Sequence, residues 1–424
     1  MLDLDLIREQ PDRVQEGARA KGEDVDIQDI LEIDEERRSL QHELDQKRQR
    51  RNEGSEKVGE LKQKGEDASE LIEELSDLSD EISDGEDRLS ELEDELDERI
   101  KWIPNLPADD VPHGSDESDN EEVRSWGERP TFESEPKTHW DLGEQLEILD
   151  IDRSAKLAGS GFYVLKGQGA RLERALLNWM LDIHTGENGY REIQVPFLNR
   201  SDALEGTGQL PKLRRDMYRT DKDGLFLIPT SEVPLINLHR EEILSEEDLP
   251  ISYTGGTACF RREAGAAGTD TRGMNRVHQF QKVEMIKICE PGTAEKELDA
   301  MIADAEDILK KLNLQYRLLE LCTGDLSFAS RRTYDLEVYA PGQDRWLEVS
   351  SLSTCSDFQA RRCDMRYRDE DGDLHYPHTL NGSGVALART VIGVLEQHQN
   401  EDGTVTIPEP LVPYMNGKER LQPE

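Results

Sequence analysis

The sequence has 424 residues, of which 93 are acidic and 52 are basic, so its formal net charge at pH 7 is −41. A surface this acidic repels polyanions, which on charge alone argues against a nucleic-acid partner. Sequence motifs and glycines placed between apolar segments argue against an intrinsically disordered acidic chain. We interpret the charge as the hydrated shell of a folded, halophilic protein, because at 1 M salt the Debye length is only about 3 Å.

The sequence predicts neither membrane insertion nor secretion. No run approaches about 18 apolar residues, and residues 1–5 lack the basic and apolar regions of a signal peptide. The five cysteines are odd in number and include no C-x-x-C pair. We therefore expect a cytoplasmic protein with reduced thiols and without zinc.

Residues 1–110 hold 16 basic and 37 acidic residues and predict a helical hairpin. Apolar residues at spacings of 3, 4 and 7 form two heptad runs on either side of a turn at Gly65, and Gly54 and Gly85 fall on skipped positions. The first run is Ile30, Ile33, Leu40, Leu44, Val58 and Leu61, and the second is Leu71, Leu75, Leu78, Ile82, Leu89, Leu92 and Leu96. Their similar lengths favour an intramolecular antiparallel pair, roughly 50 Å long, over a dimerising coiled coil.

One stretch of this hairpin, residues 47–64, reverses the acidic charge. Its basic residues are Lys47, Arg48, Arg50, Arg51, Lys57, Lys62 and Lys64, against three glutamates. Such a stretch is commonly a solvated face, but in this acidic background it predicts a phosphate-binding surface.

Proline, glycine and serine predict that residues 102–140 are a connector, and shorter apolar segments follow. Strands outnumber helices between residues 224 and 360, which predicts an antiparallel sheet with flanking helices. The expected local elements are strands at 161–165 and 192–196, a helix at 172–183, and a glycine turn entering a helix within 379–397.

The most informative string runs from Cys259 to Glu284. No G-x-x-x-x-G-K-[ST] or G-x-G-x-x-G phosphate loop is present, so side chains must bind any nucleotide phosphates. The pattern strand, glycine-rich loop, strand would bring Arg261, Glu263, Phe280 and Glu284 to one surface. An arginine suits bidentate binding of phosphate or carboxylate, and a phenylalanine offers a stacking face. A surface hairpin with ion pairs is the alternative for any one of these residues.

This string resembles motif 2 of the class II aminoacyl-tRNA synthetases. The segment ending at Glu192–Pro196 resembles motif 1, and Asn381–Arg389 resembles motif 3. In the order of these motifs and in their residues, the chain is most similar to bacterial-type seryl-tRNA synthetases. Shared strings are Thr207–Lys212, Pro229–Pro234 and Asp357–Arg362. Thr354 is a departure, because the family string usually has Asn there.

The resemblance implies an α+β fold with an N-terminal antiparallel coiled-coil arm and a class II antiparallel-sheet catalytic domain. Residues 1–110 would bind tRNA, 111–140 would connect, and 141–424 would form the catalytic domain. It further implies a homodimeric serine–tRNA ligase that makes seryl-adenylate from L-serine and ATP with Mg²⁺. The seryl group would pass to tRNA(Ser), and to tRNA(Sec) where one exists, with the arm reaching a tRNA at the other subunit.

The resemblance also implies site residues. The expected serine site is Thr230, Ser231, Glu232, Arg261, Glu284 and Ser383. The expected ATP site is Arg261, Arg262, Glu263, Val277, His278, Gln279, Phe280, Glu348, Val349, Ser350, Ser351 and Arg389. Glu348 and Ser351 would hold Mg²⁺, and Arg261, Arg389 and Glu348 would be catalytic. The tRNA would contact the basic residues between 47 and 64.

Other interpretations remain for parts of the chain. A carrier-protein amino-acid ligase would lack the long hairpin, and a non-catalytic scaffold would lack the motif arginines. We expect His278 to be structural despite its place in motif 2, and Cys355 to be a packed thiol without a partner base. His375 and His378 suggest loop histidines, because no third metal ligand is evident beside them.

Overall fold

The computed structural model of the chain describes residues 1–263 and 272–423, which form two compact units. The arm unit comprises Leu2–Arg19 and Glu23–Pro104, and the sheet domain comprises Met1, Ala20–Gly22 and Asn105–Glu424. The predicted glycine-rich loop of motif 2 falls largely on residues 264–271 and lies outside the described residues. None of the helices in the described ranges is long and apolar enough to cross a membrane.

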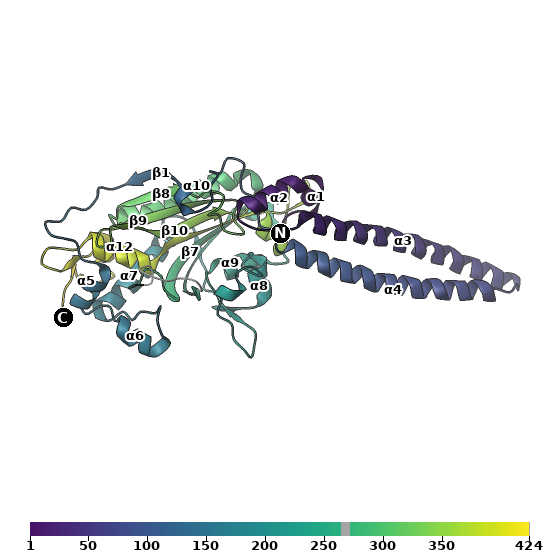
Figure 1. Cartoon of the computed structure of the whole chain (residues 1–424), viewed down its shortest axis with the longest axis horizontal. Helices are drawn as coiled ribbons and strands as arrows, with labels where there is room; N and C mark the ends of the chain where they lie inside the picture. Colours follow the sequence, from purple (N-terminus) through teal and green to yellow (C-terminus); the bar gives the residue numbers. More distant parts are fainter. Residues whose placement is uncertain (264–271, 424) are drawn as a thin grey trace. The chain divides into compact units, whose positions relative to one another are not determined.

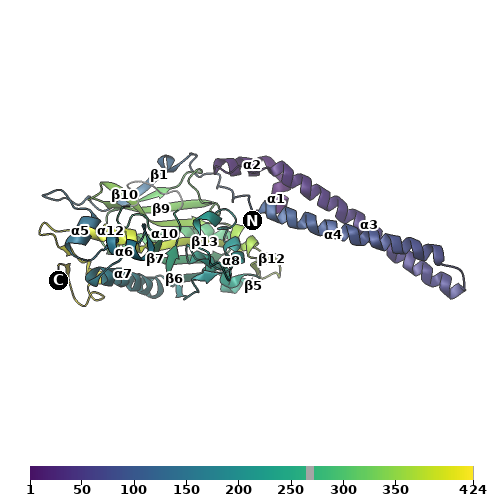
Figure 2. The same ribbon diagram turned by 60° about the horizontal axis from the view of Figure 1, so that its bottom comes forward.

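Two long helices form most of the arm unit, α3 (Ile27–Lys64) and α4 (Ser69–Ile100), preceded by α1 (Leu4–Glu9) and α2 (Pro11–Ala20). The long helices lie side by side and antiparallel (Figures 1 and 2). Leucines and isoleucines of both heptad runs are buried along the seam, and α3 ends at Gly65, whose φ of 72° suits glycine. The predicted hairpin is confirmed.

An eight-stranded sheet is the centre of the sheet domain as far as the structure describes it. Its order is β1-β8-β9-β10-β13-β7-β6-β2. Neighbours are antiparallel except β2 and β6, which confirms the predicted sheet type. The strands are β1 (Glu121–Trp126), β2 (Arg191–Glu192), β6 (Ile251–Phe260), β7 (Gln279–Cys289), β8 (Tyr316–Glu320), β9 (Arg332–Ala340), β10 (Arg345–Thr354) and β13 (His378–Ala386).

The two faces of this sheet carry different side chains. On β7, Val283 and Met285 belong to the main apolar core, together with residues of α7 (Gly167–Gly186), α10 (Ala294–Lys311) and α12 (Leu387–Gln397). Because strand side chains alternate, Lys282 and Glu284 point to the opposite face. The helices α7, α10 and α12 therefore cover one face. The other face presents these polar groups beside a second apolar cluster, in which Ile286 and Ile288 of β7 pack with α9 (Glu232–Ile236).

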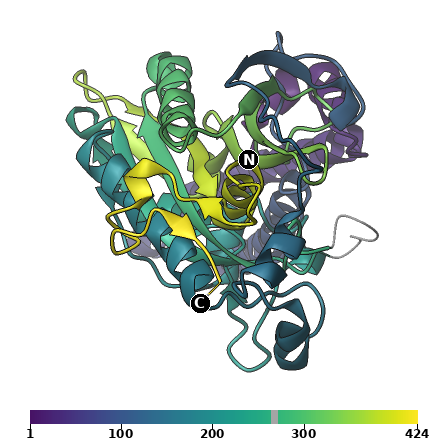
Figure 3. The same cartoon turned by 90° about the vertical axis from the view of Figure 1, so that its left-hand side faces the viewer.

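Shorter elements complete the sheet domain. They are α5 (His139–Gln145), α6 (Ile151–Ala158), α8 (Ser201–Gly206), α9 (Glu232–Ile236), α11 (Phe358–Arg362), β3 (Leu198–Asn199), β4 (Phe226–Leu227), β5 (Ile243–Ser245), β11 (Arg366–Arg368), β12 (Leu374–His375), β14 (Val405–Thr406), β15 (Arg420–Leu421), η1 (Glu117–Asp119), η2 (Arg214–Asp216), η3 (Asn237–His239), η4 (Glu246–Asp248), η6 (Pro291–Thr293) and η7 (Glu409–Leu411). The C-terminal segment, yellow in Figure 3, packs on α7, where Gln168 Nε2 donates to the carbonyl of Gln422.

Three sequence expectations differ from the structure. Residues 161–165 form no strand, and only Leu165 makes an isolated bridge with Leu149. The strand expected at 192–196 ends at Glu192, although Ile193 N still donates to Thr254 O. Part of the predicted connector is β1, an edge strand whose mostly exposed side chains give no apolar alternation to detect.

The segment resembling motif 3 is also extended where a glycine turn was predicted. Residues 378–386 form β13, and the helix α12 begins only at Leu387. The glycines serve close packing here. A β-carbon on Gly382 would lie 2.9 Å from Leu352 Cδ2, and one on Gly384 would lie 2.5 Å from His184 Nε2.

Candidate active site

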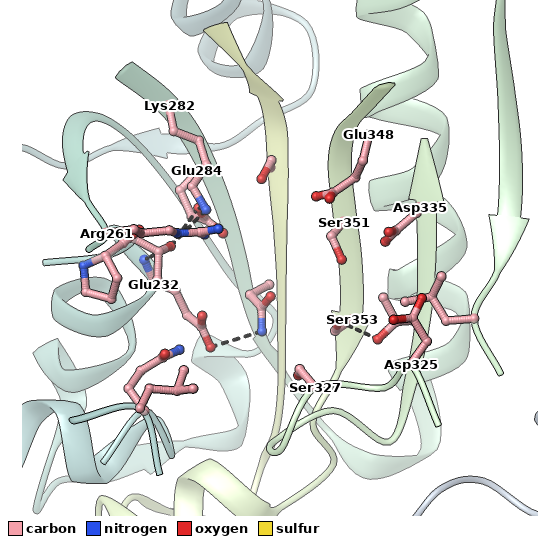
Figure 4. Close-up of a pocket in the computed structure, with 18 of the residues that line it drawn as sticks. Glu232, Arg261, Lys282, Glu284, Asp325, Ser327, Asp335, Glu348, Ser351 and Ser353 are labelled. Atoms are coloured by element: carbon pink, nitrogen blue, oxygen red, sulfur yellow. Dashed lines mark hydrogen bonds and ion pairs between the residues drawn. The ribbon is translucent and has the colours of Figure 1, made fainter. Parts of the chain in front are cut away.

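The polar face of the sheet contains a cavity of about 650 Å³, adjoined by a smaller hollow of about 80 Å³. Figure 4 shows Glu232, Arg261, Lys282 and Glu284 on one side of the cavity and Asp335, Glu348 and Ser351 on the other. The residues that line both spaces are Arg261, Glu263, Arg276, Lys282, Glu348 and Ser383. The two spaces are therefore adjacent parts of one site.

Thr230, Lys282 and Glu284 form a closed group on the first side. Thr230 Oγ1 donates to Glu284 Oε2 at 2.9 Å, and Lys282 Nζ donates to Thr230 Oγ1 at 2.9 Å. Lys282 also forms an ion pair with Glu284 Oε2, and all three side chains are buried. The β7 alternation places Lys282 and Glu284 on the same face of the strand.

Glu232 begins α9 and is buried beside this group. Its Oε1 accepts hydrogen bonds from Gln359 Nε2 at 2.6 Å and from Asn381 Nδ2 at 3.1 Å. Burial and the nearby charge of Glu284 raise the pKa of Glu232 to about 7. The carboxyl is therefore poised to change charge near neutral pH and suits a cationic ligand when ionised.

Arg261 follows the last residue of β6, and its backbone N–H donates to His278 O at 2.9 Å. Its guanidinium lies 5.3 Å from the centre of the Phe280 ring. Phe280, Val277 and Arg389 line the smaller hollow. A cation beside an aromatic face in a hollow of this kind suits a planar ring that carries a phosphate.

Glu348 of β10 faces this region from the other side. Arg389 Nη1 lies 3.2 Å from Glu348 Oε2, and Arg389 Nε donates to Asn275 O at 3.0 Å. Burial would raise the pKa of Glu348, but Arg389 and Arg261 outweigh it and hold the pKa below its usual value. The carboxyl therefore stays ionised.

Oxygen atoms near Glu348 could hold a hard cation. Ser351 lies opposite Asp335 in the β9–β10 pairing, and both line the cavity. Burial and the charge of Glu348 raise the pKa of Asp335 well above its usual value. Within the described ranges no group of three or more His, Cys, Asp or Glu is arranged to hold a metal. The set fits Mg²⁺, which takes one or two protein carboxylates and completes its shell with water and phosphate oxygens.

The structure brings most of the predicted site residues together. Thr230, Glu232, Arg261, Glu263, Glu284, Glu348, Ser351 and Ser383 line the cavity, and Val277, Phe280 and Arg389 line the hollow. Six others line neither space, namely Ser231, Arg262, His278, Gln279, Val349 and Ser350. His278 instead stacks on Phe162, with ring centroids 5.2 Å apart, and its Nδ1 lies 2.8 Å from the Tyr218 hydroxyl.

Sequence reasoning did not assign several polar residues of this site. Among them, Lys282, Asp335 and Asn381 line the cavity, Arg276 pairs with Glu263, and Gln359 holds Glu232. Two of them had a local signal, because Lys282 lies two residues before Glu284 and Asn381 two residues before Ser383, each on the same strand face.

The remaining candidates outside the cavity are structural. His375 lies in β12 and His378 begins β13, so neither is the loop residue that was expected, and His375 Nε2 lies 2.7 Å from Asp369 Oδ2. The Cys355 thiol is buried, and burial raises its pKa well above the usual range. Thr354 Oγ1 accepts from Ser356 N at 3.4 Å.

The predicted basic surface of the arm unit is of two kinds. Lys47 pairs with Glu81 of α4, Arg48 with Glu86, and Arg50 with Glu74, while Lys64 pairs with Glu60 on its own helix. In the part of the chain that the structure describes, no ion pair involves Arg51, Lys57 or Lys62. Lys47, Arg48 and Arg50 link the two helices of the hairpin, whereas Arg51, Lys57 and Lys62 are available to a partner.

Two family models match the chain. The model of the tRNA synthetase class II core domain (G, H, P, S and T) matches residues 216–398. The model of the seryl-tRNA synthetase N-terminal domain matches residues 1–107. The chain is 52% identical to the serine–tRNA ligase of Caldicellulosiruptor saccharolyticus, over 98% of this chain and 99% of that protein. It is also 52% identical to that of Thermotoga neapolitana, over 98% of each.

Solved structures give the same result. The seryl-tRNA synthetase of Pyrococcus horikoshii complexed with ATP superposes with a TM-score of 0.94, at 36% identity and over the full length of both chains. The cytoplasmic serine–tRNA ligase of Naegleria fowleri in complex with AMP has a TM-score of 0.87 and 29% identity, covering 100% of this chain and 99% of that one.

Proposed function

The chain belongs to the seryl-tRNA synthetase family, whose members are serine–tRNA ligases with a class II core, and from that premise we propose how it works. It joins L-serine to ATP as seryl-adenylate and then transfers the seryl group to tRNA(Ser). The observation that carries this proposal is the convergence of Thr230, Glu232, Arg261 and Glu284 on one cavity beside the Phe280 hollow.

Serine occupies the cavity next to β7. Its ammonium group binds Glu232 and Thr230, and its hydroxyl binds Glu284 and Ser383. Support comes from the burial of these groups, because a buried acceptor that is left unpaired costs roughly 1–3 kcal/mol. An alanine substrate would leave such acceptors unpaired, whereas threonine must be excluded by shape, which is weaker for a single methyl group.

The adenine of ATP occupies the adjoining hollow, and its phosphates extend into the cavity toward Arg261 and Glu348. Phe280 stacks on the adenine, Glu263 accepts from the adenine amine, and Arg389 binds from the opposite side. Arg261 lies where the two spaces meet, so it contacts both the serine carboxylate and the α-phosphate. Its position next to Phe280 supports this assignment.

Adenylate formation needs positioning and charge neutralisation. A serine carboxylate oxygen attacks the α-phosphorus, the bond to the bridging oxygen breaks, and pyrophosphate leaves. Arg261 and Arg389 neutralise the growing negative charge, and no nucleophilic side chain is needed. Glu348 and Ser351 would hold Mg²⁺, which supplies further positive charge at the phosphates when it is bound.

Transfer to tRNA assigns the two units different tasks. Residues 1–110 bind tRNA through the hairpin, by shape and backbone contacts, and residues 141–424 perform catalysis. We place β1, which falls in the expected connector 111–140, with the catalytic part because it pairs with β8.

The enzyme is proposed to be a cytoplasmic homodimer of a halophile that also charges tRNA(Sec) where one exists. The long hairpin favours tRNA over a carrier protein as acceptor.

Serine-dependent pyrophosphate exchange in molar KCl tests the proposal. Exchange should depend on serine and fall by orders of magnitude with alanine, but by less with threonine, which only shape excludes. Cysteine is a further control. Arg261→Ala should abolish exchange while circular dichroism shows a folded protein. Arg368→Ala, on β11 and outside both lining sets, is the matched control and should keep exchange within about twofold of wild type. Exchange retained by Arg261→Ala would refute the assigned role.

A further inference from the structure

Lys282 is a buried cation in the cavity whose role none of the motifs explains. It lies on β7 two residues before Glu284, lines both the cavity and the hollow, and is only 6% exposed. Figure 4 shows its ammonium group directed to the Glu284 carboxylate. A buried lysine is costly unless it is paired, so this pairing fixes the position of both groups.

The contacts of this group assign each oxygen of Glu284. Oε2 accepts from the Thr230 hydroxyl at 2.9 Å and forms the ion pair with Lys282. Among the described residues, Oε1 has no hydrogen-bonding partner, and its carboxylate lines the cavity. One oxygen is thus held by the protein, and the other is left as an acceptor for a ligand.

Thr230 completes the arrangement. Its hydroxyl donates its single hydrogen to Glu284 and accepts from Lys282 Nζ at 2.9 Å. The backbone N–H of Glu232 also donates to this oxygen at 3.2 Å, so both lone pairs of the hydroxyl are already used and Thr230 is fixed in place. Lys282 therefore orients Thr230 as well as Glu284.

We propose that Lys282 is a positioning residue for serine selection. It holds Glu284 Oε2, both directly and through Thr230, so that Oε1 is turned to accept the substrate hydroxyl. The inference rests on the proposed function, because it presumes that serine occupies this cavity.

Removal of Lys282 has a specific consequence. Glu284 would lose the cation that holds its Oε2, which leaves the buried side chain free to rotate. Rotation removes the ordered acceptor for a hydroxyl. Serine then loses its advantage over alanine, while the adenine hollow keeps Phe280 and Arg389.

The test compares Lys282→Met with Lys287→Met in the full-length enzyme. Lys287 is also a buried lysine of β7, but it pairs with Glu297 of α10 at 2.6 Å and lines neither space. Lys287→Met therefore controls for the loss of a buried ion pair on the same strand. Pyrophosphate exchange gives the KM values for serine and ATP, and calorimetry gives each affinity even where exchange is absent.

Lys282→Met should raise the KM or Kd for serine by roughly 10- to 100-fold, the range for a lost hydrogen bond to a charged group. The preference for serine over alanine should fall by a similar factor, while ATP affinity stays within about threefold. Lys287→Met should leave all three quantities within about threefold. Unchanged serine affinity and preference in Lys282→Met, or an equal loss of ATP affinity, would overturn the role of Lys282.

Lys282→Gln is the second variant if Lys282→Met does not fold. The amide keeps a neutral donor but no charge, so serine affinity and selectivity should fall in the same direction, and wild-type values would overturn the proposal. A wild-type enzyme without serine-dependent exchange would instead count against the proposed function itself. The two failures are therefore distinguishable.

Discussion

Gln359 Nε2 donates a 2.6 Å hydrogen bond to Glu232 Oε1 inside the cavity. The amide is itself fixed, because Thr379 Oγ1 donates to Gln359 Oε1 at 2.6 Å. This hydrogen bond stabilises the ionised carboxylate and lowers its pKa, yet burial and Glu284 act more strongly and raise the pKa to about 7. The charge of Glu232 at the proposed ammonium site therefore changes near pH 7.

We predict that serine binding strengthens as pH rises through about 7. Only the ionised Glu232 attracts an ammonium group, so its protonation at lower pH weakens binding. For a pKa of about 7, the KM for serine should be roughly 10-fold higher at pH 6 than at pH 8. Exchange kinetics at fixed ionic strength measure this, with the KM for ATP as the internal control.

Gln359→Leu sharpens this test. Loss of the donor should raise the pKa of Glu232 further and move the midpoint of the serine profile to higher pH. Glu232→Gln should weaken serine binding and remove the pH dependence. A serine KM that stays flat between pH 6 and 8 in wild type would contradict the assignment of Glu232.

The second prediction concerns the basic side chains of α3 that have no ion pair. Lys57→Gln with Lys62→Gln should raise the KM for tRNA by roughly 5- to 20-fold and reduce the slope of log affinity against log salt by about 1 per lost contact. Exchange without tRNA should not change. Tight tRNA binding with an unaltered salt slope would show that these lysines do not contact phosphate.

Arg88→Gln with Arg99→Gln is matched to those lysines in charge, because it also removes two positive charges from the arm unit. Arg88 pairs with Glu36 and Arg99 with Asp29 across the hairpin, so this control additionally includes the effect of losing such ion pairs. This control should raise the KM for tRNA less than Lys57→Gln with Lys62→Gln does. Arg48 and Arg50 are poor choices for such a test, because each pairs with a residue of α4 and its reversal would also disturb the hairpin.

Local patterns predicted the parts of the fold that depend on local geometry. Heptad spacing predicted the two helices because it follows from the period of a helix. Gly65 marked the turn because glycine suits the left-handed conformation that ends α3. The same reasoning failed at residues 161–165. An apolar run there has the composition of a strand, but the carbonyl of Gly161 accepts from His278 N instead of joining a ladder.

The cavity depends on long-range pairing, which single-sequence patterns do not contain. Resemblance supplied Thr230, Glu232 and Glu284, but Gln359 and Asn381 reach Glu232 from α11 and β13, more than 120 residues away. Gln359 has no predicted site residue beside it in the sequence, whereas Asn381 lies two residues before Ser383. The net charge of −41 gave no signal either, because it does not indicate Arg261, Arg276 and Lys282, the three basic residues among the described ones that line the cavity.

The last prediction concerns three glycines of the hairpin that differ in what surrounds them. A β-carbon on Gly85 would lie 2.6 Å from Cδ2 of Leu44, and one on Gly54 would lie 2.6 Å from Cδ2 of Leu75. Leu44 is only 1% exposed, whereas Leu75 is half-buried and can turn aside. Gly59 has no atom within 4 Å of the same position among the described residues, so it is the matched control.

Alanine at these sites should separate helix propensity from packing. Gly59→Ala should stabilise the hairpin by up to about 1 kcal/mol, the usual gain over glycine in a helix. Gly54→Ala should gain less, and Gly85→Ala should destabilise it, because overpacking a filled seam costs roughly 1–3 kcal/mol. Hydrogen exchange of the α3 and α4 amides in molar KCl measures the local free energy of opening. Equal stabilisation by Gly85→Ala and Gly59→Ala would show that the seam at Leu44 tolerates a side chain and that Gly85 is not required for close approach.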